Sequence, residues 1–178
     1  AGCGLLGLFL ALQEPQRQVR CVDIRRSPLA ERLWRCLCAH RPDLKERVEF
    51  EVDDLRGGGV HMKPAPQQSF VVSCHACGLL TDEVLAVATS RNFLRPLVVL
   101  PCCYPLHPRV ATSRKRTWQT LPWLEEGAVN LQGVDAVDAA RLRHLTSIGY
   151  HATVQHIDPS ITPMNRALVA VPQRGVAQ

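Results

Sequence analysis

Three glycines near the start of the sequence have a spacing that suits a nucleotide-binding turn. Gly2, Gly4 and Gly7 form the pattern G-x-G-x-x-G at the mouth of an apolar segment, residues 4–13, whose composition favours a helix. Glycines permit a tight turn and a close approach of a ligand to the backbone, and a helix N-terminus offers unpaired N–H groups and a positive dipole. The motif alone has low specificity, so its meaning depends on the residues that come after it in the chain.

An acidic residue stands at the distance expected for a ribose-binding site. Residues 19–24, VRCVDI, are rich in β-branched side chains and predict a strand, and Asp23 stands at its end, 21 positions after Gly2. A carboxylate at this place accepts hydrogen bonds from ribose hydroxyls. The glycines and Asp23 together predict a nucleoside-containing ligand, and nicotinamide dinucleotides and S-adenosylmethionine both fit. The alternative is a helix start followed by an exposed aspartate.

The elements that must position these residues alternate between strand and helix. Ser27 is typical of a helix N-cap and Pro28 of the first helical residue, so we predict a helix that runs to about His40. Further helices are predicted at 81–92 and 134–148, and further strands at 48–52, 69–74, 97–100, 150–157 and 166–171. We therefore expect a single α/β domain over residues 1–178, with a parallel sheet covered by helices on both faces and a C-terminal antiparallel hairpin.

Side chains capable of chemistry lie just after the ends of several predicted strands. Asp54 follows the strand VEFEV, the segment CHACGLLTD (residues 74–82) follows the next strand, and PCCY (residues 101–104) follows the one after. In an open α/β sheet, ligands bind outside the carboxyl ends of the strands. We therefore expect these groups to meet Gly2, Gly4 and Asp23 on one rim of the sheet.

This combination resembles the class I S-adenosylmethionine-dependent methyltransferases. The terminal hairpin, with its segment IDPSITPMNRAL, differs from a dinucleotide fold, which continues with parallel units. Residues 75–82 match H-x-C-G-x-x-T-D, and Cys102-Cys103 matches the C-C motif, of one methyltransferase branch. That branch includes eukaryotic tRNA 2′-O-ribose methyltransferases, methyltransferase-like proteins and the methyltransferase domain of proteins named for a glutathione S-transferase C-terminal domain. The resemblance extends from Gly2 to about Val171.

The resemblance implies methyl transfer with S-adenosylmethionine as the cofactor. Gly2 and Gly4 would admit its methionine portion, Asp23 would hold the ribose, and Asp54 would reach the adenine amino group. Cys74, at the end of a predicted strand, is the remaining candidate for cofactor binding. Most of the rate of methyl transfer comes from positioning, with a general base only where the acceptor must lose a proton.

Four residues are candidates for the catalytic side of the site. His75 is the leading candidate for a base or an acceptor-positioning residue, because its pKa can lie near neutrality. Asp82 either orients His75 or only caps the following helix. Cys102 and Tyr104 complete the set.

The clustered cysteines leave three interpretations. Cys74, Cys77, Cys102 and Cys103 could supply zinc ligands together with His75, or one cysteine could form a nucleophilic pair with that histidine. However, C-x-x-C occurs once here, and adjacent cysteines do not easily share one tetrahedral ion. We therefore predict no metal, and cysteines that pack against the cofactor.

The methyl acceptor is unidentified, and RNA is one candidate. Residues 114–116 (RKR) with Trp118 and Trp123 form either an RNA-contacting segment or a solvated loop. Tyr104 and Pro105 follow the cysteine pair where the tRNA enzymes have histidines, and zinc-finger-like segments are missing from the sequence. The class of acceptor therefore stays open.

The composition indicates the class of protein and its cellular compartment. The 178 residues are 46% hydrophobic and 21% charged with a net charge of +5, which is typical of a globular domain. No apolar run reaches the roughly 18 residues of a membrane span, so we expect no membrane segment. Eight cysteines without a secretion signal predict a reducing, cytoplasmic compartment.

Two functions other than methyl transfer also fit parts of the sequence. The first is a NAD-dependent oxidoreductase, against which the terminal hairpin counts. The second is a non-catalytic methyltransferase-like binding module, against which the retained Gly2, Gly4, Asp23 and Asp54 count.

The glycine loop stands unusually early in this sequence. In class I methyltransferases a first strand precedes that loop and lies at the centre of the sheet, whereas this sequence starts inside the loop. We therefore expect an N-terminally truncated domain that lacks its first strand, with two halves of the sheet beside a gap of unpaired backbone.

Overall fold

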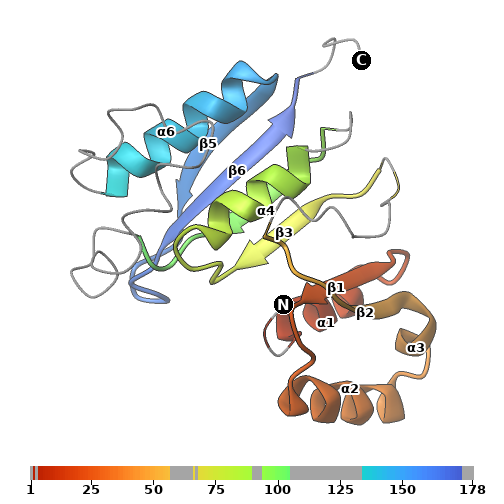
Figure 1. Ribbon diagram of the computed structural model, residues 1–178. Helices are drawn as coiled ribbons and strands as arrows, with labels where there is room; N and C mark the ends of the chain where they lie inside the picture. The colour runs from red at the N-terminus through yellow and green to blue at the C-terminus, as the bar shows by residue number, and fades with distance from the viewer. Residues whose placement is uncertain are drawn as a thin grey trace. The chain divides into compact units, whose positions relative to one another are not determined.

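The computed structural model describes residues 2, 4–56, 66, 68–89, 94–104 and 134–173. It divides into two compact units, Ala1–Lys63 and Pro64–Gln178, which are described one at a time (Figure 1). Within the described residues, no helix is both long enough and apolar enough to cross a bilayer. The basic segment with Trp118 and Trp123 lies outside the described residues.

The described part of the N-terminal unit contains a two-stranded parallel sheet with three helices. β1 (Val19–Asp23) pairs with β2 (Val48–Val52), and α1 (Leu5–Gln13) packs against both strands. α2 (Pro28–His40) and the short α3 (Leu44–Arg47) complete the unit. Its buried core consists of Leu8, Ala11, Cys21, Cys38, Leu44 and Val48.

Local sequence explains where these elements begin and how closely they pack. Ser27 caps α2 as predicted, because its Oγ accepts a hydrogen bond from the backbone N–H of Ala30 at 3.1 Å. Gly7 lies on α1 where an added Cβ would collide with the Sγ of Cys21 on β1. The third glycine of the motif therefore allows the helix to lie directly on the strand.

Within its described residues, the C-terminal unit contains a four-stranded mixed sheet with two helices. Its strands are β3 (Val71–Cys74), β4 (Leu97–Leu100), β5 (Tyr150–His156) and β6 (Arg166–Pro172). Their order across the sheet is β3-β4-β6-β5, with β3 and β4 parallel and both contacts of β6 antiparallel. α4 (Leu80–Thr89) contacts β3, and α6 (Val134–Ser147) lies along β5 and β6 (Figure 1).

The predicted α/β architecture is confirmed, as are both parallel strand pairs and the antiparallel hairpin of β5 and β6. The predicted helices and strands begin and end within a few residues of the observed bounds wherever the structure describes them. The single-domain organisation and the missing first strand stay predictions.

A buried tyrosine anchors the sheet of the C-terminal unit. Tyr150 is fully buried at the start of β5, and its hydroxyl donates to the carbonyl oxygen of Arg95 at 3.0 Å. The same hydroxyl accepts from the backbone N–H of Arg95 at 2.9 Å. One side chain thus satisfies both backbone groups of a buried residue that precedes β4.

Tyr150→Phe tests this anchor. Removal of the hydroxyl leaves the N–H and carbonyl of Arg95 unpaired in the interior, so we expect the free energy of unfolding to fall by about 1–3 kcal/mol. Urea unfolding monitored by circular dichroism measures the change. A loss below about 0.5 kcal/mol, the usual range of a neutral surface substitution, would contradict the anchoring role.

Candidate functional site

The glycine loop and the end of β1 meet directly in the N-terminal unit. The backbone N–H of Gly2 donates to Oδ2 of Asp23 at 2.6 Å, and the N–H of Arg25 donates to Oδ1 at 3.4 Å. Gly4 has a φ of 75° and precedes α1, and an added Cβ there would lie 2.6 Å from the ring of Phe50. The loop is therefore held by its glycines and by the carboxylate that we predicted as the ribose ligand.

Two adjacent acids come after β2, and their surroundings differ. Asp54 is paired with Arg56, whose Nε donates to Oδ2 at 2.9 Å and whose backbone N–H donates to Oδ1 at 3.0 Å. These bonds lower the pKa of Asp54. Asp53 uses Oδ1 to accept the N–H of Asp54 at 2.7 Å, whereas its Oδ2 is buried without a hydrogen-bond partner among the described residues. The carboxylate of Asp53 is thus a candidate hydrogen-bond acceptor for a ligand, and the sequence did not indicate it.

The loop after β3 places His75 in an uncommon backbone conformation. His75 has a φ of 62°, in the left-handed region that costs most residues about 1–2 kcal/mol. Its backbone N–H donates to the carbonyl of Leu100 at 3.1 Å, and the N–H of Gly78 donates to the carbonyl of Cys103 at 2.9 Å. These two bonds fasten the loop after β3 to the segment after β4. His75 itself is exposed.

Three thiols gather where those two segments meet. The Sγ atoms of Cys77 and Cys102 are 2.8 Å apart, and those of Cys102 and Cys103 are 3.6 Å apart. All three sulfur atoms lie within 4.8 Å of one another. Burial, together with hydrogen bonding and charge repulsion from the other two thiols, raises the pKa of Cys102. Cys74, the last residue of β3, does not belong to this group.

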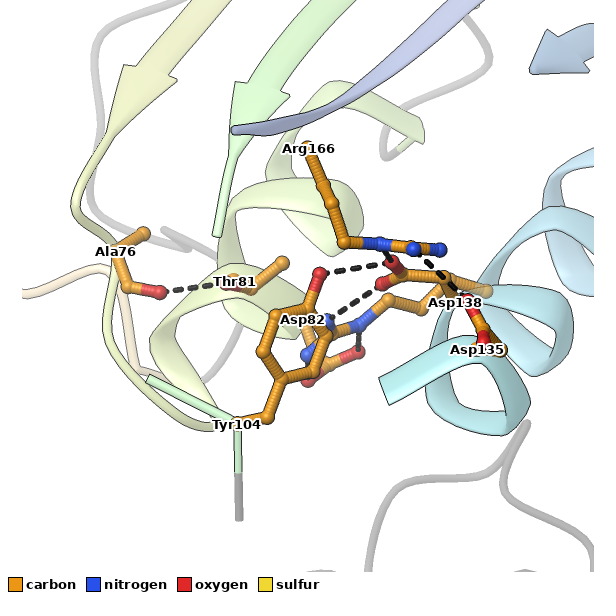
Figure 2. Close-up of polar contacts among 8 residues, drawn as sticks. Ala76, Thr81, Asp82, Tyr104, Asp135, Asp138 and Arg166 are labelled. Atoms are coloured by element: carbon orange, nitrogen blue, oxygen red, sulfur yellow. Dashed lines mark hydrogen bonds and ion pairs between the residues drawn. The ribbon is translucent and has the colours of Figure 1, made fainter. Parts of the chain in front are cut away.

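A network of buried charges connects the helices of the C-terminal unit (Figure 2). Arg141 on α6 donates to Asp82 on α4 through Nε at 2.9 Å and through Nη2 at 2.8 Å. Its Nη1 also lies 3.4 Å from Oδ1 of Asp138 on the same helix. The exposed fractions of Asp82, Asp138 and Arg141 are 0%, 1% and 1%, so the three groups interact without solvent.

The network extends to β6 and to the segment after β4. Arg166 on β6 donates through Nε to Oδ2 of Asp138 at 2.7 Å, and the hydroxyl of Tyr104 donates to the same oxygen at 2.7 Å. Burial, and then the Asp138 carboxylate, raise the pKa of Tyr104. The phenol therefore stays protonated, and its hydroxyl is committed to holding the segment that contains Cys102 and Cys103.

The structure gives Asp82 a partner that the sequence did not indicate. Its two carboxylate oxygens accept bonds from Arg141, which is 59 positions away in the chain. The adjacent Thr81 also contributes inside α4, because its hydroxyl donates to the carbonyl of Ala76 at 2.5 Å (Figure 2). Asp82 thus joins α4 to α6, and Thr81 secures the loop that carries His75.

The predicted site residues fall into two groups, one in each unit. Gly2, Gly4, Asp23 and Asp54 belong to the N-terminal unit, and Cys74, His75, Asp82, Cys102 and Tyr104 belong to the C-terminal unit. Gly2 and Asp23 are brought into contact, and so are Tyr104 and the buried charges around Asp138. That all of them meet on one rim stays a prediction.

Comparison with protein families identifies the class of protein. The model of a family described as a methyltransferase domain matches residues 1–107, which is more than half of the chain. The chain therefore belongs to this methyltransferase domain family. The match confirms a methyltransferase family, while the class I assignment, the use of S-adenosylmethionine and the particular branch stay predictions. Searches of curated proteins and of solved structures gave no match.

Arg141→Met tests the buried network. It leaves the Asp82 carboxylate buried without its cation, so we expect the free energy of unfolding to fall by about 3–5 kcal/mol. Arg143→Met is the matched control, because Arg143 is exposed on the same helix. Denaturant unfolding of both variants measures the difference. Equal stability of the two variants would show that the buried ion pairs do not hold the unit together.

Proposed function

We propose that this chain is the cofactor-binding part of an S-adenosylmethionine-dependent methyltransferase. The observation that carries the proposal is the 2.6 Å hydrogen bond between the Gly2 N–H and the Asp23 carboxylate, in a chain of the methyltransferase domain family. This contact joins the glycine motif to the acid at the end of β1. It is the pair of groups from which the sequence predicts a nucleoside ligand.

The N-terminal unit has donors and acceptors that fit such a cofactor. A carboxylate has about four acceptor positions, so Asp23 can hold the glycine loop and also accept ribose hydroxyls. The buried Oδ2 of Asp53 needs a hydrogen-bond donor, and an adenine amino group is one. An added Cβ at Gly2 would meet nothing within 4 Å, so its backbone is open to the methionine portion of the ligand.

Asp54 would have to exchange its bonds to Arg56 before it could take the adenine role that we predicted. We therefore assign the adenine amino group to Asp53 first and to Asp54 second. The exposed Asp54–Arg56 pair would then cover the solvent side of the adenine amino group.

The C-terminal unit contains the residues that we propose for the methyl acceptor. S-adenosylmethionine, when bound, supplies an electrophilic methyl group. His75 is exposed and held at a left-handed φ by the backbone bond to Leu100, so its imidazole is available to position an acceptor or to remove its proton. Tyr104 remains a protonated phenol that fixes the segment after β4. The acceptor is unidentified, and RNA remains a candidate.

Asp23→Ala is expected to weaken cofactor binding without unfolding the protein. The carboxylate both holds the glycine loop and accepts ribose hydroxyls, so the affinity for S-adenosylhomocysteine should fall at least about tenfold. Isothermal titration calorimetry measures the affinity, and the same titration of Asp53→Asn and Asp54→Asn ranks the two adenine candidates.

Asp158→Ala is the matched control for this experiment. Asp158 is an exposed aspartate that, like Asp23, accepts a backbone N–H two residues ahead, but it lies in the turn before β6. If Asp23→Ala binds S-adenosylhomocysteine as tightly as Asp158→Ala does, the assignment of Asp23 to the ribose is contradicted. Tighter binding of NAD than of S-adenosylhomocysteine by the wild type would favour the oxidoreductase instead.

His75→Asn is expected to reduce turnover while leaving cofactor affinity unchanged. Asparagine tolerates the left-handed φ but cannot act as a base near neutral pH, so the rate should fall by about 100- to 10,000-fold. Label transfer from radioactive S-adenosylmethionine to fractionated cell extract measures the rate. His151→Asn is the control, because His151 is an exposed histidine on β5. Equal losses of turnover and cofactor affinity would indicate a structural role for His75.

A further inference from the structure

We propose that Cys77, Cys102 and Cys103 form a zinc site in the C-terminal unit. The three Sγ atoms lie within 4.8 Å of one another, and they come from two segments that leave neighbouring parallel strands. Thiolate sulfur is a preferred ligand of Zn²⁺, at a Zn–S distance of about 2.3 Å. The proposal stands apart from cofactor binding, because its residues and its readouts involve neither the glycine loop nor Asp23.

The separations between the sulfur atoms suit one tetrahedral ion. Zn–S bonds of about 2.3 Å at a tetrahedral angle place thiolate sulfurs about 3.8 Å apart. Cys102 and Cys103 are already 3.6 Å apart, and Cys77 and Cys102 need to open from 2.8 Å by a rotation of their side chains. We expected sequence adjacency to keep Cys102 and Cys103 from sharing an ion, but their Sγ atoms have the separation that sharing requires.

The backbone holds the ligands in place before any ion arrives. Gly78, next to Cys77, donates its N–H to the carbonyl of Cys103 at 2.9 Å. Thr81 secures the same loop through the carbonyl of Ala76, and Tyr104 is fixed by its bond to Asp138. The entropic cost of bringing the thiols together has therefore been met by folding, which favours metal binding.

Zinc binds thiolates, so the three thiols must lose their protons when the ion binds. Zinc would form three Zn–S bonds as three thiol protons leave to solvent, and a water molecule would take the fourth position. Cys103 is exposed and provides a path for the ion. The ion would fasten the loop that carries His75 to the segment that carries Tyr104.

Zinc analysis of the purified full chain tests the proposal. After loading with Zn²⁺ and removal of excess metal, we expect a single zinc per chain by elemental analysis, and a thiolate-to-metal absorption band when Co²⁺ replaces zinc. Cys103→Ser should lower zinc affinity by at least about tenfold in a chelator competition. Cys36→Ser is the control, since Cys36 is an exposed free thiol on α2.

A second readout needs no variant. Bound zinc should protect Cys77, Cys102 and Cys103 of the wild type from alkylation, mapped by mass spectrometry, while Cys36 reacts at the same rate with and without zinc. Absence of zinc in the loaded wild type would overturn the proposal. A zinc affinity of Cys103→Ser equal to that of Cys36→Ser would also overturn the proposal.

Discussion

Two carboxylates, Asp82 and Asp138, lie in the interior of the C-terminal unit, where water cannot solvate their charges. A buried charge is tolerated only when it is paired and hydrogen-bonded, so the elements around these two groups must bring cations to them. Arg141 reaches Asp82 with two hydrogen bonds, and Arg166 reaches Asp138. These requirements connect α4, α6 and β6 to one another (Figure 2).

The candidate acceptor side depends on this network. Tyr104 donates its hydroxyl to Asp138, which fixes the segment after β4, and that segment accepts a backbone bond from Gly78 in the loop after β3. The segments that carry His75 and the three thiols are thus held in place through this network. The N-terminal unit uses a shorter connection, in which one partly buried carboxylate, Asp23, holds the glycine loop directly.

Local sequence signals predict much of this structure. The Ser27 cap, the apolar strands and the terminal hairpin are determined by neighbouring residues, and the parallel pairing is a consequence of their alternation with helices. The thiol cluster also has a sequence signal. When β3 and β4 pair with Cys74 opposite Leu100, the segments that contain the cysteines must leave the sheet side by side.

The remaining parts depend on contacts that sequence proximity does not indicate. The neighbours of Asp82 suggest only local roles for it, yet its partner Arg141 is 59 positions away. The available signal is on α6, where Asp138 follows the apolar Val134 by four residues and Arg141 is four residues from both Val137 and Leu145. The sequence likewise does not indicate whether Asp53 or Asp54 would bind the adenine amino group. That choice depends on which of the two carboxylates is buried at the end of β2.

The most direct test of the cofactor account is nuclear magnetic resonance of the ¹⁵N-labelled chain titrated with S-adenosylhomocysteine. The account predicts that the backbone amide signals of Gly2, Gly4, Asp23 and Asp53 shift together along one binding curve, while those of the exposed turn around Asp158 stay in place. A titration that leaves the glycine loop and the ends of β1 and β2 unchanged would contradict it.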